Sequence, residues 1–131
     1  FSQQGTELLS YHQVREGRKE VESRFADVAP ERCWNIQKKV CVMLNEKTFS
    51  AGESVAFLMK GKPNVIVSGK TSAGGAHAGS FLTIPIPGTE KKLVGFIPNS
   101  YITAPEKEHD WEGTGVSPDI EGDFGTYDFT F

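Results

Sequence analysis

Ser50 stands where an apolar run passes into a predicted helix, and a serine hydroxyl at such a junction can act as a nucleophile. The run Val40–Leu44 precedes it, and a helix is predicted over residues 50–59. The first backbone N–H groups of a helix have no intrahelical acceptor, and the helix dipole is positive there. An oxyanion formed beside Ser50 would therefore meet donors already in place. A structural interpretation is also open, because Ser50 and Glu53 have the spacing of a helix capping box.

The glycine-rich segment 68–77 ends with a second chemically useful side chain, that of His77. Its Gly-Lys-Thr sequence follows a predicted strand, as in a phosphate-binding loop. Such a loop also needs a glycine at position 64, which is Asn64 here, so the spacing argues against nucleotide binding. The glycines instead predict a backbone that runs close to something bulky. His77 is either a structural histidine or a general base, and the residues alone leave both roles open.

A third segment, residues 111–119, contains the acidic residues Glu112 and Asp119. Acidic side chains in loops are mostly solvated, so neither is a strong candidate by itself. Asp119 follows a proline and is expected to be a turn or cap residue that accepts backbone amides. His109 and Asp110 could form a local pair, but their charged neighbours favour a solvated loop.

The elements that must position these side chains form a strand, a helix and a second strand. Val40–Leu44 is short and fully hydrophobic, which is typical of a strand covered on both faces. The helix over residues 50–59 is followed by lysines, a glycine and a proline, which are helix-ending signals, and residues 65–67 are a second apolar run. This order predicts an α/β fold with a parallel crossover. The loops after both strands should then reach the same edge of the sheet.

The flanking regions differ in character. Residues 81–86 and 93–97 are apolar runs around a turn-rich segment, which predicts a β-hairpin. The first thirty residues are polar and fit helical periodicity only loosely, so we expect one or two solvent-facing helical pieces or a flexible arm. We therefore divide the chain into a polar lead-in, residues 1–32, and a main domain, residues 33–131.

The composition favours a globular protein and argues against a nucleic-acid partner and an integral membrane segment. The chain has 131 residues, with 37% hydrophobic and 24% charged, and a net charge of -3. The charge argues against a nucleic-acid partner. No apolar run is long enough for an integral membrane segment, and the first residues lack a signal-peptide pattern.

The two cysteines, Cys33 and Cys41, carry little functional information. They could pair in an oxidising compartment, but Cys41 lies in a predicted buried strand, so two free thiols are favoured. Neither a zinc-type spacing nor a Cys-x-x-Cys motif is present. We expect no metal and no organic cofactor.

Residues 48–53, 69–77 and 111–120 together resemble three ordered motifs of the tail-specific or C-terminal processing protease family, peptidase S41. The match is closest to the branch that includes interphotoreceptor retinoid-binding protein. In that family the serine of the first motif is the nucleophile of a serine-type peptidase, and it maps onto Ser50. The resemblance implies part of a crotonase/Clp-protease-like superhelix, with the strand-helix-strand unit followed by a β-hairpin-rich C-terminal region.

The resemblance also implies roles for other residues. The lysine base of the processing proteases falls on Gly75, so His77, which an extended segment would place on the same face, is the expected base. Glu112 would orient that base as the third member of a triad. The backbone amides of Ala51, Gly74 and Gly75 are the expected oxyanion or substrate-binding donors.

The resemblance implies a peptide or protein substrate and an extracytoplasmic, periplasmic or membrane-associated, location. Nothing before residue 40 resembles the earlier half of the family's domain, so we expect an incomplete and inactive piece that pairs with that half or with a second copy. Two other functions stay open. One is a non-catalytic module that binds an apolar ligand through aromatic residues, namely Phe81, Phe96, Tyr101 and Trp111. The other is an inactive structural fragment.

Overall fold

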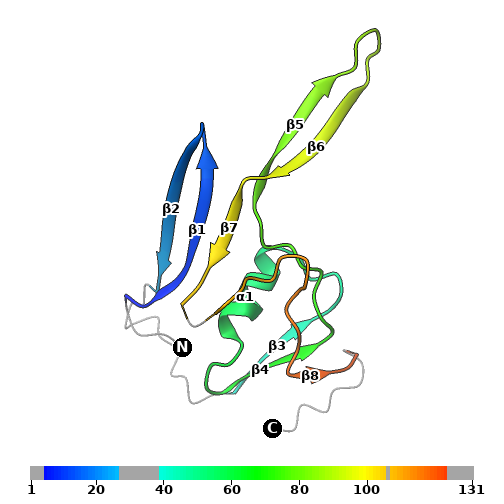
Figure 1. Ribbon diagram of the computed structural model, residues 1–131. Helices are drawn as coiled ribbons and strands as arrows, with labels where there is room; N and C mark the ends of the chain where they lie inside the picture. Colours follow the sequence, from blue (N-terminus) through cyan, green and yellow to red (C-terminus); the bar gives the residue numbers. More distant parts are fainter. Residues whose placement is uncertain (1–4, 27–38, 106, 124–131) are drawn as a thin grey trace, which may run out of the picture.

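The computed structural model describes residues 5–26, 39–105 and 107–123 (Figure 1). Its strands are β1 (Glu7–Arg15), β2 (Arg18–Phe25), β3 (Val40–Leu44), β4 (Val65–Gly69), β5 (Gly79–Pro85), β6 (Lys92–Pro98), β7 (Ser100–Thr103) and β8 (Ile120–Glu121), and its helix is α1 (Ala51–Met59). Within these ranges no helix is long and apolar enough to span a membrane.

The strands β3, β4 and β8 form a parallel sheet, with β4 in the middle. The predicted strand-helix-strand unit is therefore confirmed, and Val42 lies opposite Val67 in its register. Asp119 joins β8 to β4, because its carboxylate accepts the Val67 N–H at 2.9 Å while its own N–H donates to the Val67 carbonyl at 2.7 Å. This confirms the expected cap role of Asp119. Cys41 is a half-buried free thiol in β3, and Cys33 lies outside the described residues.

The helical prediction for the first part of the chain is wrong, because β1 and β2 form an antiparallel hairpin. Its two-residue turn consists of Glu16 and Gly17, whose φ angles of 49° and 76° are both positive, as in a type I′ turn. β1 also pairs with β7, which gives the sheet order β2-β1-β7. The pairing partner lies about ninety residues away, so local periodicity carried no signal for it. The proposed boundary at residue 32 lies outside the described residues.

One hydrophobic core joins the antiparallel sheet, the helix and the parallel sheet. Its buried members come from β1, β3, α1, β4, β7 and the loops between them: Leu9, Leu44, Ala56, Phe57, Val67, Ala76, Ile102, Trp111 and Val116. The Phe57 ring on α1 packs against the Trp111 ring at a centroid distance of 4.8 Å. This contact places the loop after Trp111 beside the helix.

The predicted hairpin is also confirmed, because β5 and β6 pair along their full length. It projects away from the rest of the chain (Figure 1). The large apolar side chains on both of its faces are exposed, with Phe81 76% and Leu93 61% accessible.

A buried carboxylate joins α1 to the loop between β4 and β5, residues 70–78, which we call the glycine-rich loop. The Glu53 side chain is 0% exposed. Its two oxygens accept hydrogen bonds from the backbone N–H groups and the one hydroxyl around it: Ser50 N–H at 2.7 Å, Ser72 Oγ at 2.5 Å, Gly74 N–H at 2.7 Å and Gly75 N–H at 2.9 Å. Glu53 therefore holds the helix N-terminus and the glycine-rich loop in one arrangement.

The pKa of Glu53 reflects this environment. Burial by itself raises the pKa of the carboxyl group, since it disfavours the charged form. The hydrogen bonds from the four donors favour the charged form and outweigh burial, so the pKa lies below its ordinary value of 4.5. Glu53 is thus a stabilising anion in the folded chain at neutral pH.

We expect Glu53→Gln to lower the free energy of unfolding by about 3 kcal/mol or more, because the amide leaves buried donors without an acceptor. Chemical denaturation at neutral pH measures the loss. Glu46→Gln is the matched control, since Glu46 is an exposed carboxylate close by in the sequence. Equal stability of the two variants would contradict the role of Glu53.

The lowered pKa also predicts an acid-dependent loss of stability. A carboxyl whose folded pKa is depressed stabilises the fold above its unfolded pKa, and this stabilisation disappears as the pH falls through the folded pKa. Between about pH 7 and about pH 3, the original chain should lose more unfolding free energy than Glu53→Gln, which has no proton to bind at this site. Denaturation curves at several pH values would show parallel losses if Glu53 contributed nothing.

Candidate active site

Ser50 occupies a sharp turn between β3 and α1. Its φ of 53° and ψ of -118° are unusual for a residue with a side chain. A strained turn from strand to helix is the geometry that presents a nucleophilic serine in other hydrolase folds. The residue is exposed, and its N–H donates to Glu53 as the predicted capping box requires. Ala51 follows as the first residue of the helix, so its N–H has no acceptor within the helix.

The glycine-rich loop runs directly against the turn that contains Ser50. The Ala73 N–H donates to the Thr48 carbonyl at 2.9 Å. A Cβ atom built on Gly75 would lie 2.1 Å from Cε2 of the Phe49 ring, so no larger residue fits without movement. This confirms the prediction that the glycines allow a close backbone approach, and the bulky neighbour is the residue before Ser50.

The structure gives Gly74 and Gly75 a structural partner. Both N–H groups, which the sequence suggested as oxyanion donors, donate to the Glu53 carboxylate. A donor already bound to a buried anion is poorly placed to stabilise a second one. The proposal below therefore uses only the Ala51 amide for the oxyanion.

His77 pairs with Asp110, a residue that the sequence analysis assigned to a solvated loop. The His77 Nε2 atom lies 2.9 Å from Asp110 Oδ2, and the Asp110 side chain is only 15% exposed. The expectation for Asp110 is therefore wrong, although its neighbour His109 is 84% exposed as expected. No local signal indicated this pair, because His77 and Asp110 are 33 residues apart in the chain.

Glu112 holds the backbone of the His77 segment and does not pair closely with the ring. Its Oε2 atom accepts the N–H groups of Ala76 and His77, each at 2.7 Å. The distance from Oε2 to His77 Nδ1 is 3.9 Å, which is beyond hydrogen-bond range. Asp110 also accepts the Glu112 N–H at 3.0 Å. The structure thus brings His77, Asp110 and Glu112 together, with Asp110 as the direct partner of the imidazole.

No group of three or more His, Cys, Asp or Glu side chains within residues 5–26, 39–105 and 107–123 could hold a metal ion. The acidic and histidine side chains of the site instead bond to backbone amides and to each other. Their arrangement is suited to proton transfer and to holding loops.

Solved structures with a similar fold include two of particular interest. The photosystem II D1 C-terminal processing protease is 18% identical with a TM-score of 0.61, and the alignment covers 92% of this chain and 28% of that one. A lipoprotein from Streptococcus agalactiae is 16% identical with a TM-score of 0.61, and the alignment covers 90% and 41%. This chain thus spans less than half of either structure, and the likeness concerns the fold. The shared fold consists of mixed strands with few helices.

A search of curated proteins found no significant match. The comparison with family models matched residues 2–122 to Peptidase family S41. That range includes all three segments that position Ser50, His77 and Glu112. The chain belongs to peptidase family S41.

Proposed function

We propose that this chain supplies the nucleophile of a serine-type peptidase and that Ser50 attacks a peptide carbonyl. The observation that carries the proposal is the strained strand-to-helix turn at Ser50, whose amide is anchored by the buried Glu53 carboxylate. Strain at such a position is sustained by surrounding structure and is typical of functional sites. Family membership supports hydrolysis of a peptide or protein.

His77 is the proposed general base, through its Nδ1 atom. Because Nε2 faces the Asp110 carboxylate at 2.9 Å, the imidazole carries its proton on Nε2 and leaves the Nδ1 lone pair available. The Ser50 hydroxyl proton would pass to Nδ1 as Oγ bonds to the carbonyl carbon. The Ala51 N–H would stabilise the oxyanion. Collapse then breaks the C–N bond, and the leaving amine takes the proton from Nδ1.

Water completes the reaction by attacking the acyl-enzyme. It gives a proton to Nδ1 and its oxygen bonds to the acyl carbon, and release of the carboxylate product returns the proton to Ser50 Oγ. Asp110 and Glu112 act as positioning residues in this scheme. Asp110 sets the tautomer of His77, and Glu112 holds its backbone.

The wider context is part of the same proposal. The strand-helix-strand unit would contribute to a crotonase/Clp-protease-like superhelix that is completed by the preceding half of the domain or by a second copy. We place the protein outside the cytoplasm, since one structure of similar fold is described as a lipoprotein.

Binding of an apolar ligand without hydrolysis is the alternative that resemblance to the retinoid-binding branch suggests. The four aromatic residues proposed for it do not form one pocket. Trp111 is 2% exposed in the core, whereas Phe81 and Phe96 pair on the projecting hairpin with ring centroids 5.3 Å apart. Of the four, only Tyr101 lines the pocket of about 590 Å³ that is described below.

A fluorophosphonate probe tests the nucleophile. In the complete protein, with the half of the domain or the second copy that completes the fold, Ser50 should be labelled, and Ser50→Ala should reduce labelling and peptide hydrolysis by about a thousandfold or more, because the attacking oxygen is lost. Ser54→Ala is the matched control, since Ser54 is a half-buried serine one turn further along α1. Absence of labelling at Ser50 would contradict a role of Ser50 as the nucleophile and would favour the alternative, a module that binds a ligand without hydrolysis.

The positioning role of Asp110 predicts a change in the pH dependence of labelling. Asp110→Asn should lower the labelling rate by about 10²–10⁴-fold and shift its pH profile, because the amide can favour the wrong tautomer of His77. Asp110→Glu should restore part of the rate. Glu108→Gln is the control, since Glu108 is 90% exposed. A slower rate with an unchanged pH profile would mean that Asp110 only supports the loop.

A further inference from the structure

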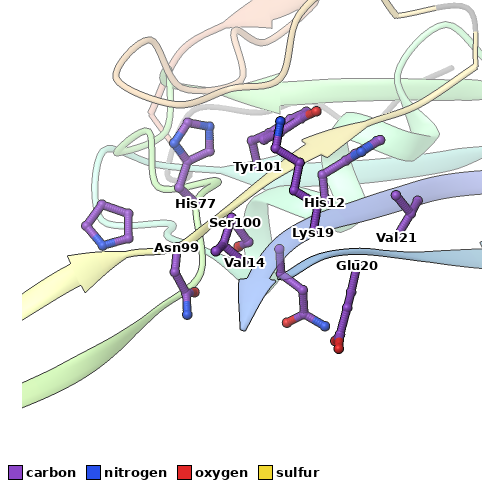
Figure 2. A pocket seen from close by; sticks show the side chains of 11 residues that line it. His12, Val14, Lys19, Glu20, Val21, His77, Asn99, Ser100 and Tyr101 are labelled. Carbon is purple, nitrogen blue, oxygen red and sulfur yellow. The ribbon is translucent and has the colours of Figure 1, made fainter. Parts of the chain in front are cut away.

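A pocket of about 590 Å³ lies at the β2-β1-β7 sheet, and most of the strand residues that line it are on the face that is turned away from the core. Its lining comes from β1, β2, the segment around β7 and the glycine-rich loop, as Figure 2 shows. The volume is within the range of about 300–1,000 Å³ that is typical of ligand sites. It is therefore large enough for a short segment of peptide.

Strand alternation explains which side chains line this face. His12 lies opposite Val21 on one side and opposite Tyr101 on the other, so the three share one face of the sheet. The His12 and Tyr101 rings stack at a centroid distance of 4.5 Å and an interplanar angle of 5°. The neighbouring strand positions are on the opposite face, where Leu9 and Ile102 are buried in the core. The strands that line the pocket are thus held in place by the core residues on their other face.

His77 belongs to both the pocket and the candidate active site. The glycine-rich loop leads from the pocket back to the nucleophile, because Gly75 packs against Phe49, the residue before Ser50. An extended peptide advances about 3.3 Å per residue, so residues close to a bond cleaved at Ser50 can reach past His77. The pocket therefore adjoins the candidate active site at His77.

We propose that this pocket binds an aliphatic or aromatic side chain of the peptide substrate, within a few residues of the cleaved bond. The proposal rests on the function proposed above. Val14, Val21, Pro98 and Tyr101 supply the apolar part of the lining. Such a surface gains free energy when it covers an apolar side chain.

The lining also contains charged side chains. Apart from two histidines, these are Lys19 and Glu20, which are neighbours on β2 and point to opposite sides of the strand, as Figure 2 shows. The ammonium of Lys19 and the side-chain amide of Asn99 can hydrogen-bond the backbone of a peptide.

Fluorescence anisotropy with labelled peptides tests the proposal on the Ser50→Ala chain, in which no hydrolysis by Ser50 interferes. The peptides consist of glycine and serine, with a single leucine moved through successive positions. We expect at least one leucine position to bind at least tenfold more tightly than the peptide without leucine. Val21→Asp should abolish this preference, because it places a carboxylate in the pocket.

Val94→Asp is the matched control. Val94 is 59% exposed and Val21 is 61% exposed, and Val94 lies on the β6 hairpin strand and outside the pocket lining. It should keep the leucine preference. Val21→Thr, which has nearly the same shape as valine, should give an intermediate loss and replaces Val21→Asp if that variant fails to fold.

The proposal is overturned if no leucine position is preferred, or if Val21→Asp and Val94→Asp behave alike. Its failure is distinct from failure of the proposed function. Labelling of Ser50 by a fluorophosphonate without a leucine preference would support the nucleophile and reject the pocket. A leucine preference that Val21→Asp removes, without labelling of Ser50, would support the pocket in a chain that binds peptides without cleaving them.

Discussion

A single buried carboxylate, that of Glu53, connects the parts of the molecule that make up the candidate site. It lies at the first turn of α1, where helix amides and dipole favour an anion. Its remaining partners, Ser72, Gly74 and Gly75, come from the glycine-rich loop. An unpaired carboxylate in this position would be very costly, so the helix start and the loop must form together.

The strained turn at Ser50 is a consequence of this arrangement. Its N–H is held by Glu53, while the Gly75 backbone lies against the Phe49 ring that precedes it. The same loop then continues to His77, where carboxylates from the segment around Trp111 hold the ring and the backbone. The loop after β3, the glycine-rich loop after β4 and the segment around Trp111 therefore converge. This convergence brings the segments that carry Ser50, His77 and Glu112 into one part of the molecule.

The antiparallel sheet carries the pocket that we propose for a side chain of the substrate. β1 and β2 are distant in sequence from the glycine-rich loop, yet they line a pocket that includes His77. Placing an apolar pocket beside the candidate base would let substrate binding energy contribute to orientation of the cleaved bond. The projecting β5–β6 hairpin lies beyond this region and exposes apolar residues on both faces.

The sequence by itself determined the elements whose signals are local. The parallel unit around α1 and the β5–β6 hairpin followed from apolar runs and turn residues, and the ordered motifs at Ser50, His77 and Glu112 indicated the family. Tertiary structure alone decided the pairing of β1 with β7, the burial of Asp110 beside His77 and the use of the Gly74 and Gly75 amides by Glu53. Each of these depends on partners far apart in the chain, and a hydrogen bond between distant residues leaves no periodic trace in either local segment.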